Sequence, residues 1–187
     1  MLQIQKALLM KRFTQLILLF LCPLMCNTLI AEESIEGAFG KFLGDYFDPK
    51  SATGKSALTD GTPMYRFNPK NPYRAFNSYF VMITPKSNRI FSIWAIGGFD
   101  NSSKAKNEQS VLLKVLESKY GSKGKQDLFS ALYDSESINH GDRYILTKVS
   151  GVFDVTLEVR YYDKKLEEVA EEERLEIESN KVDSSGL

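Results

Sequence analysis

The sequence predicts an α+β fold, a mainly antiparallel sheet of about five strands with helices on one face. Two pairs of runs rich in β-branched and aromatic residues are each joined by a short turn, as in a β-hairpin, and each pair precedes a helical pattern. The strand–helix–strand alternation that marks a parallel sheet is missing. Because the order hairpin then helix occurs twice, the pattern is compatible with two β-hairpin–helix units, which arose by duplication or independently.

The first hairpin comprises residues 76–84 and 89–96, joined by Pro85-Lys86-Ser87-Asn88. A shorter strand at residues 64–67 precedes it. A helix is expected from about Lys104 to Tyr120, because residues 100–103 offer N-cap side chains and Gly121 suits the C-terminal end. The expected apolar stripe of this helix consists of Val111, Leu112, Val115, Leu116 and Tyr120.

The second hairpin comprises residues 143–149 and 152–162. Apolar and polar residues alternate in its second strand, which indicates that one face of the sheet is covered and the other faces water. Asp163 suits the N-cap of a final helix, which becomes rich in glutamate after Ala170. A short helix at residues 126–133 and a turn at residues 139–142 are also expected. The glycine-rich residues 34–63 predict an irregular segment anchored by its aromatic side chains.

Residues 1–31 have the pattern of a signal peptide, which places the protein in the periplasm or outside the cell. Lys11 and Arg12 precede an apolar run too short to span a bilayer, and Ala31 suits the cleavage position. Met10 is an alternative start to Met1. The remainder predicts a single α+β domain at residues 32–180 and a flexible tail at residues 181–187. No stable membrane insertion is expected after cleavage.

The charge and the cysteines narrow the classes of partner and chemistry. Cleavage after Ala31 removes three of 24 basic residues and none of 24 acidic ones, which leaves 21 basic residues and a net charge of −3. Nucleic acid is not expected as a partner, because a nucleic-acid-binding domain needs a basic excess. Cys22 and Cys26, the only cysteines, lie in the signal segment, so the exported domain has no disulfide, thiolate metal site or cysteine nucleophile.

Motifs for catalysis are weak, and no cofactor or metal is expected. Gly54-Lys55-Ser56 has the form of a phosphate-loop end, but Pro49 stands where that loop requires glycine. His140, the only histidine, lies among turn residues, so a solvated position is expected. The carboxylates of Asp45, Asp48 and Asp60 lack EF-hand spacing, yet they leave a calcium site or a carboxylate-dependent hydrolase as alternatives.

The strongest binding candidate is the segment 65–76, in which cations alternate with aromatic residues between prolines. Such a surface suits a small anionic or glycan-like ligand or a partner protein. The alternative is that the aromatic residues anchor the core and the cations are their solubilising neighbours. Trp94 is expected in the core. The acidic residues of 167–178 are expected to form a solvated helix face or, alternatively, a docking surface. The candidate ligand- or partner-binding residues are Tyr65, Arg66, Lys70, Tyr73 and Arg74.

Six short motifs carry a family resemblance. They are Gly37-Ala38-Phe39-Gly40, Met64-Tyr65-Arg66-Phe67-Asn68-Pro69-Lys70-Asn71-Pro72, Ile83-Thr84-Pro85-Lys86, Ile93-Trp94-Ala95, Lys119-Tyr120-Gly121 and Val182-Asp183-Ser184-Ser185-Gly186-Leu187. Through them the chain resembles a group of small uncharacterised exported proteins of Gram-negative bacteria. The resemblance implies a single periplasmic domain and brings no catalytic motif.

These observations together predict an exported, non-catalytic envelope protein that binds a ligand or a protein partner. Two alternatives stay open. One is a carboxylate-dependent hydrolase, which requires convergent acidic side chains in a pocket. The other is an inhibitor or neutraliser of another exported protein, which requires an exposed aromatic surface.

Overall fold

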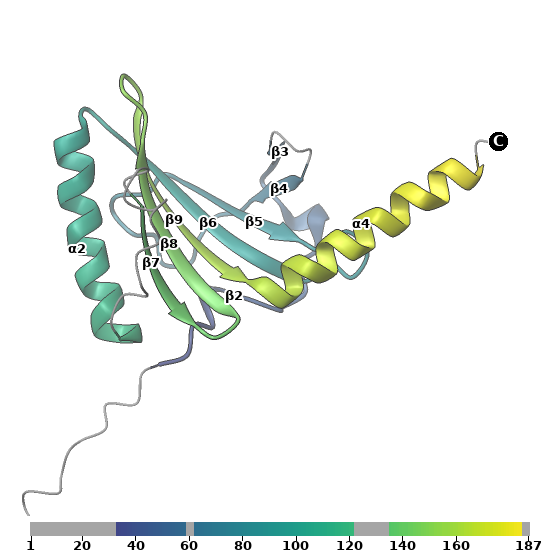
Figure 1. Cartoon of the computed structure of the whole chain (residues 1–187). Helices are drawn as coiled ribbons and strands as arrows, with labels where there is room; N and C mark the ends of the chain where they lie inside the picture. Colours follow the sequence, from purple (N-terminus) through teal and green to yellow (C-terminus); the bar gives the residue numbers. More distant parts are fainter. Residues whose placement is uncertain (1–32, 59–61, 122–134, 185–187) are drawn as a thin grey trace, which may run out of the picture. The chain divides into compact units, whose positions relative to one another are not determined.

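The fold is α+β, as the sequence predicts, and its sheet has seven strands instead of about five (Figure 1). A computed structural model describes residues 33–58, 62–121 and 135–184. The expected signal peptide, the short helix at residues 126–133, Asp60 and residues 185–187 lie outside the described residues. Neither described α-helix is long and apolar enough to cross a membrane.

Every neighbouring pair of strands in the sheet is antiparallel. The spatial order is β3 (Gly54–Ala57), β4 (Pro63–Arg66), β5 (Ser78–Ile83), β6 (Ile90–Phe99), β9 (Val155–Asp163), β8 (Arg143–Ser150) and β7 (Ser135–His140). A separate ladder pairs β1 (Gly37–Ala38) with β2 (Lys41–Phe42). The helices are the 3₁₀ helix η2 (Pro49–Ser51) and the α-helices α2 (Ser102–Tyr120) and α4 (Lys164–Ser184).

The two strands that the sequence analysis did not include lie at the edges of the sheet. β3 consists of Gly54, Lys55, Ser56 and Ala57, and β7 is polar at most positions. Edge strands need less apolar surface than central ones, so their sequences lack the pattern that identifies a strand. The Gly54-Lys55-Ser56 motif is therefore part of an edge strand, and its backbone does not form a phosphate loop.

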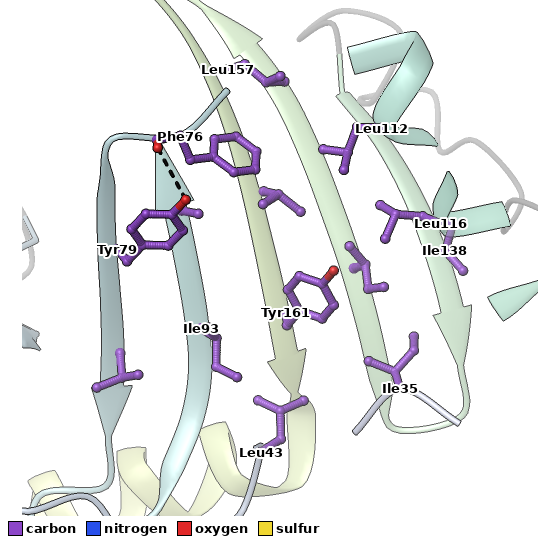
Figure 2. Close-up of a cluster of buried hydrophobic side chains, with 14 of the residues drawn as sticks. Ile35, Leu43, Phe76, Tyr79, Ile93, Leu112, Leu116, Ile138, Leu157 and Tyr161 are labelled. Atoms are coloured by element: carbon purple, nitrogen blue, oxygen red, sulfur yellow. Dashed lines mark hydrogen bonds between the residues drawn. The ribbon is translucent and has the colours of Figure 1, made fainter. Parts of the chain in front are cut away.

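One face of the sheet, called here the closed face, carries the main core. Helix α2 packs on it through residues spaced by three or four positions, which are Ala105, Gln109, Leu112, Leu116 and Tyr120. Figure 2 shows Leu112 and Leu116 beside apolar side chains of the sheet, among them the fully buried Leu157. Val111 and Val115, which the sequence analysis placed in the stripe, are 44% and 55% exposed. The buried stripe of α2 is therefore rotated around the helix axis relative to the stripe expected from the sequence. This stretch of the helix contains more apolar residues than one helix face can bury, so Val111 and Val115 remain exposed.

The N-terminal segment completes the closed face. Ile35, Leu43 and Phe47 are buried in the main core, and the Phe39 ring packs edge-on against Tyr79 at 5.0 Å between centroids. The aromatic anchoring expected for this segment is therefore confirmed for Phe39 and Phe47, whereas Phe42 and Tyr46 are largely exposed. Tyr79 closes the loop before β5, because its hydroxyl shares one proton between the carbonyl oxygens of Tyr73 and Phe76, at 3.1 Å and 3.2 Å. Figure 2 shows the bond to Phe76.

Helix α4 packs on the opposite face, called here the open face, so the expectation that all helices cover one face is wrong. Leu166 and Ala170 contact an apolar cluster that contains Met82, Phe91 and Tyr162. Asp163 starts the helix as expected, because its carboxylate accepts from the Leu166 amide and also pairs with Arg143 at 2.9 Å. α4 continues to Ser184, into residues assigned to a flexible tail.

The middle of α4 is fastened to the β5–β6 turn. The Glu173 carboxylate accepts hydrogen bonds from the Lys86 and Ser87 amides and from the Ser87 hydroxyl. Lys86 also pairs with Glu176. The acidic residues of this helix are therefore not only a solvated face, since two of them hold the helix against the sheet.

Candidate binding site on the open face of the sheet

The open face is covered by α4 only at one end, as far as the described residues show. The α4 side chains packed on its apolar cluster are Leu166 and Ala170. Further from α4, the half-buried side chains of Phe80 and Ile96 belong to the same cluster. The strand alternation therefore buries one face under α2 and leaves side chains such as Phe80 and Ile96 only half-buried on the other.

A single row of cross-strand neighbours runs over the open face. The register pairs Arg66 with Phe80, Phe80 with Trp94, Trp94 with Arg160, Arg160 with Leu146 and Leu146 with Ser137. Cross-strand neighbours of this kind lie in side-chain contact distance. The structure thus assembles two arginines, two aromatic residues, a leucine and a serine from six strands into one line, called here the central row.

Trp94 and Arg160 form the centre of this row. The guanidinium carbon of Arg160 lies 3.7 Å from the Trp94 ring centroid, the geometry of a cation–π contact. Arg160 also donates to the Glu158 carboxylate at 2.8 Å and to the Tyr162 hydroxyl at 3.2 Å. Burial lowers the pKa of Arg160, but Tyr162 and Glu158 outweigh burial and raise it, so the guanidinium stays charged. A fixed cation therefore lies over the only tryptophan of the chain.

The Trp94 indole has an unused hydrogen-bond donor. Its side chain is 7% exposed, and its Nε1 atom has no hydrogen-bond partner. A buried donor without an acceptor costs about 1–3 kcal/mol. If the central row served only to pack the sheet, neither a buried donor without an acceptor nor a charged Arg160 above it would be needed.

A pair of stacked tyrosines flanks the central row on the side of α4. The rings of Tyr144 and Tyr162 are 4.8 Å apart and inclined by 10°. Burial and the neighbouring Tyr162 and Glu167 raise the pKa of Tyr144, so its phenol is protonated at neutral pH. The flank therefore offers flat aromatic surface and a hydroxyl donor, features common in protein interfaces.

The open face ends in a cavity beneath α4, with a volume of about 160 Å³. Its wall is mostly apolar, and Glu167, Glu171 and Arg174 form its charged rim. Partial burial raises the pKa of the Glu167 carboxyl. The apolar lining residues are Leu58, Pro63, Met82, Ile83, Pro85, Phe91, Tyr162 and Ala170.

The sequence-based candidate residues do not form one surface. Arg66 lies on the open face as the first member of the central row, exposed, with a hydrogen bond to the Ser78 hydroxyl at 3.3 Å. Tyr65 points to the closed face, half-buried, with its ring 6.0 Å from that of Phe47. Tyr73 and Arg74 meet at Glu108 of α2, at 2.8 Å and 3.2 Å. Lys70 is exposed. The structure therefore brings Tyr73 and Arg74 together and separates them from Arg66.

The alternative chemistry weighed from the sequence has little geometric support among the described residues. Asp48 accepts from the Lys50 amide at 2.9 Å and caps η2, a structural role. No group of three metal-binding side chains is found in the described ranges. His140 is half-buried and its Nε2 contacts the Tyr120 carbonyl oxygen at the end of α2, so the expected solvated position is wrong.

Comparison of the chain with family models, curated proteins and solved structures finds no match. The resemblance to exported proteins therefore stays a prediction. The central row itself was missed by sequence reasoning, which selected Arg66 as a binding candidate and expected Trp94 in the core, where it is indeed buried. Only the register between strands far apart in sequence places Phe80, Trp94 and Arg160 side by side.

Proposed function

We propose that the protein is an exported, non-catalytic envelope protein whose open face binds a protein partner. The observation that carries the proposal is the central row, with its buried, unpartnered Trp94 donor beneath the charged Arg160. Tryptophan, tyrosine and arginine dominate binding hot spots, because they combine large apolar area with polar groups. The members of the row include no nucleophile beside a base and no paired carboxylates, so the proposal contains no reaction step.

The arrangement of charge suggests the chemistry of the partner. Arg66 and Arg160 lie three strands apart, about 14 Å, with Phe80 and Trp94 between them. A partner segment with apolar side chains at its centre and acidic groups on both sides would fit this spacing. A glycan fits less well, since the Trp94 ring is already covered by Arg160.

The export part of the proposal rests on the signal-peptide pattern of residues 1–31. Intact-mass measurement on protein from fractionated Gram-negative cells tests it separately. The expected species begins at Glu32 and is found in the periplasm or the medium. Recovery of the uncut chain from the cytoplasm alone would contradict export without affecting the binding surface.

The binding part is tested through the fluorescence of the only tryptophan, Trp94. Peptides with an acidic–apolar–acidic pattern are titrated into the protein and compared with peptides of the same composition in scrambled order. Binding over the central row should change the emission of Trp94. Replacing Arg66 by Ala should weaken binding on the order of thirtyfold, the loss typical of a hot-spot arginine.

The matched control is Arg74→Ala, since Arg74 is an exposed arginine paired with Glu108 away from the central row. It should bind as the parent does, and both variants should keep the thermal midpoint. If Arg74→Ala weakens binding and Arg66→Ala does not, the binding surface is the Tyr73–Arg74 cluster and the open-face assignment is wrong. Unchanged emission with every peptide would also count against it.

A further inference from the structure

The cavity beneath α4 has the size and the wall of a site for one aromatic ring. Its volume is about 160 Å³, and an apolar protein cavity of about 150 Å³ is known to bind benzene. Met82, Phe91 and Tyr162 are among the apolar residues of its wall. Sites for small molecules are typically concave and mostly apolar, with a few polar groups that fix the orientation of the ligand. The cavity can therefore hold a ring with a short substituent, and a larger body would not fit.

The charged side chains at the rim of this cavity do not cancel. Glu167, Glu171 and Arg174 carry two negative charges and one positive charge. Arg174 pairs with Glu171 and also donates to the Thr62 hydroxyl at 3.3 Å. The ion pairs that α4 forms within the described residues use side chains other than Glu167. Among the described residues, the Glu167 carboxylate is therefore the rim charge without a counterion of its own.

The surroundings of Glu167 favour a positively charged ligand group. Glu167 is exposed, so a ligand can reach it. Partial burial of the carboxyl and the neighbouring Glu168 raise the pKa of Glu167, and Lys164 lowers this pKa by less. A raised carboxyl pKa means that the surroundings destabilise the negative charge, which a cation beside it would stabilise. Phe91 and Tyr162 in the wall suit the same ligand charge, because the faces of aromatic rings attract cations.

We propose that the cavity beneath α4 binds a small aromatic amine, with its ring against Met82 and Phe91 and its ammonium group beside Glu167. The ring matches the volume and the apolar wall, and the ammonium group matches the uncompensated carboxylate. An aromatic carboxylate fits less well, because Arg174, the only cation among the described lining residues, is already paired. A neutral ring fits the wall but leaves Glu167 without a counterion. This ligand site is independent of the partner proposed for the central row, so either proposal can fail alone.

Three probes of similar size and different charge test the proposal by NMR titration of the purified protein. They are phenethylamine, phenethyl alcohol and phenylacetate, which are positive, neutral and negative at neutral pH. The Met82 methyl resonance reports entry into the cavity, because Met82 is a buried residue of its wall. Phenethylamine should shift this resonance saturably and bind about tenfold more tightly than phenethyl alcohol, the gain expected from a hydrogen bond between charged groups. Phenylacetate should bind more weakly than both.

A matched pair of variants locates the ammonium group. Glu167→Gln should reduce the affinity for phenethylamine about tenfold, to that of phenethyl alcohol, and should leave the affinity for phenethyl alcohol unchanged. Glu168→Gln is the control, because Glu168 is the exposed neighbouring carboxylate and is not among the residues that line the cavity. It removes the same charge and should bind both probes as the parent does. Ala170→Leu narrows the cavity and should weaken the binding of both probes alike.

The titrations also define the results that overturn the proposal. If phenethylamine at tens of millimolar causes no saturable shift of the Met82 resonance, the cavity does not bind an aromatic amine. Equal affinities for phenethylamine and phenethyl alcohol, or equal losses in Glu167→Gln and Glu168→Gln, would mean that Glu167 does not recognise the cation. Tightest binding of phenylacetate would place charge recognition at Arg174 instead. Circular dichroism of each variant shows whether it is folded, and the two exposed glutamate positions decide the outcome if Ala170→Leu does not fold.

Discussion

The two faces of the sheet are built from the same strands but differ in what covers them. The closed face is covered along its length by α2 and the N-terminal segment, and its side chains are almost entirely apolar. The open face is covered only at the α4 end by the described residues, and it mixes aromatic residues with the Arg160–Glu158 pair. The difference indicates that stability resides mainly on one side and recognition on the other.

The adjacent glycines of β6 show this contrast at the smallest scale. A Cβ on Gly97 would lie 1.8 Å from the Ala75 carbonyl oxygen, because the chain before β5 crosses the closed face in direct contact with the strand. A Cβ on Gly98 would meet no atom within 4 Å. Gly97 therefore has no space for a methyl group, whereas the next residue, Gly98, has open space beside it.

The first prediction compares two leucines on neighbouring strands. Leu157 of β9 is fully buried on the closed face, whereas Leu146 of β8 is half-buried in the central row. Leu157→Ala should lower the free energy of unfolding by about 4 kcal/mol, through lost apolar contact and the cavity left behind. Leu146→Ala should lower it by about 1 kcal/mol.

Urea denaturation with circular dichroism measures both free energies, and unchanged m-values show that the unfolding reaction is the same. Equal losses for the two variants would mean that the open face contributes to folding as much as the closed face, contrary to the comparison. The same Leu146→Ala protein should weaken peptide binding in the Trp94 titration.

The second prediction uses the two glycines. Gly97→Ala should destabilise the protein by about 3 kcal/mol, because the new methyl group must push the backbone around Ala75 away. Gly98→Ala should be neutral or should stabilise by up to about 0.5 kcal/mol, since glycine is unfavourable inside a strand. Thermal melting of both variants measures the contrast. A midpoint for Gly97→Ala equal to that of the parent would show that the loop and β6 are not in contact.

The third prediction, with the smallest effect, concerns pH and the α4 end of the open face. Burial raises the pKa of Glu173, but the hydrogen bonds from Ser87 and Lys86 outweigh it and lower the pKa. A carboxyl with a lowered folded pKa stabilises the fold above its unfolded pKa of about 4.3, and the contribution is lost as pH falls through the folded pKa. Glu173→Gln should therefore cost under about 1 kcal/mol at pH 7 and nothing well below pH 4.

Urea unfolding of Glu173→Gln and the parent at both pH values tests this sign. Glu172→Gln is the control, since Glu172 is the exposed neighbouring residue on the same helix. A difference between parent and Glu173→Gln that is as large at low pH as at pH 7 would show that the ionised carboxylate is not what fastens α4 to the turn.

Much of the fold could be predicted because local pattern determines it. The central hairpins, the helix that ends at Gly121 and the cap at Asp163 all follow from short-range chemistry. The edge strands escaped prediction because their residues are polar. β6 was expected to end at Ile96, yet it continues to Phe99. Gly97 and Gly98 interrupt the pattern of β-branched and aromatic residues, so the sequence suggests that the strand ends before them. The strand nevertheless continues, and Gly97 leaves room for the Ala75 backbone to pack against it.

The candidate site was harder to predict, because its residues meet only through long-range pairing. Arg66 was selected for the aromatic and basic residues that surround it in sequence, whereas its spatial neighbour is Phe80. Strand alternation turns Tyr65 to the other face, so two adjacent residues that looked like one motif serve different surfaces. Arg160 was visible as an outward residue of its strand, but only the β6–β9 register places it over Trp94.

The β6–β9 pairing also has a consequence for the order in which parts of the chain fold. Strands β3 to β6 and strands β7 to β9 each form a series of sequential neighbours, whereas β6 and β9 pair across the segment that contains α2. Closing a long loop costs entropy before any contact offsets it, so the two halves are expected to form early and the central seam late. Substitutions in the outer hairpins should therefore slow refolding, whereas those along the late-forming seam, such as Val159→Ala, should mainly accelerate unfolding.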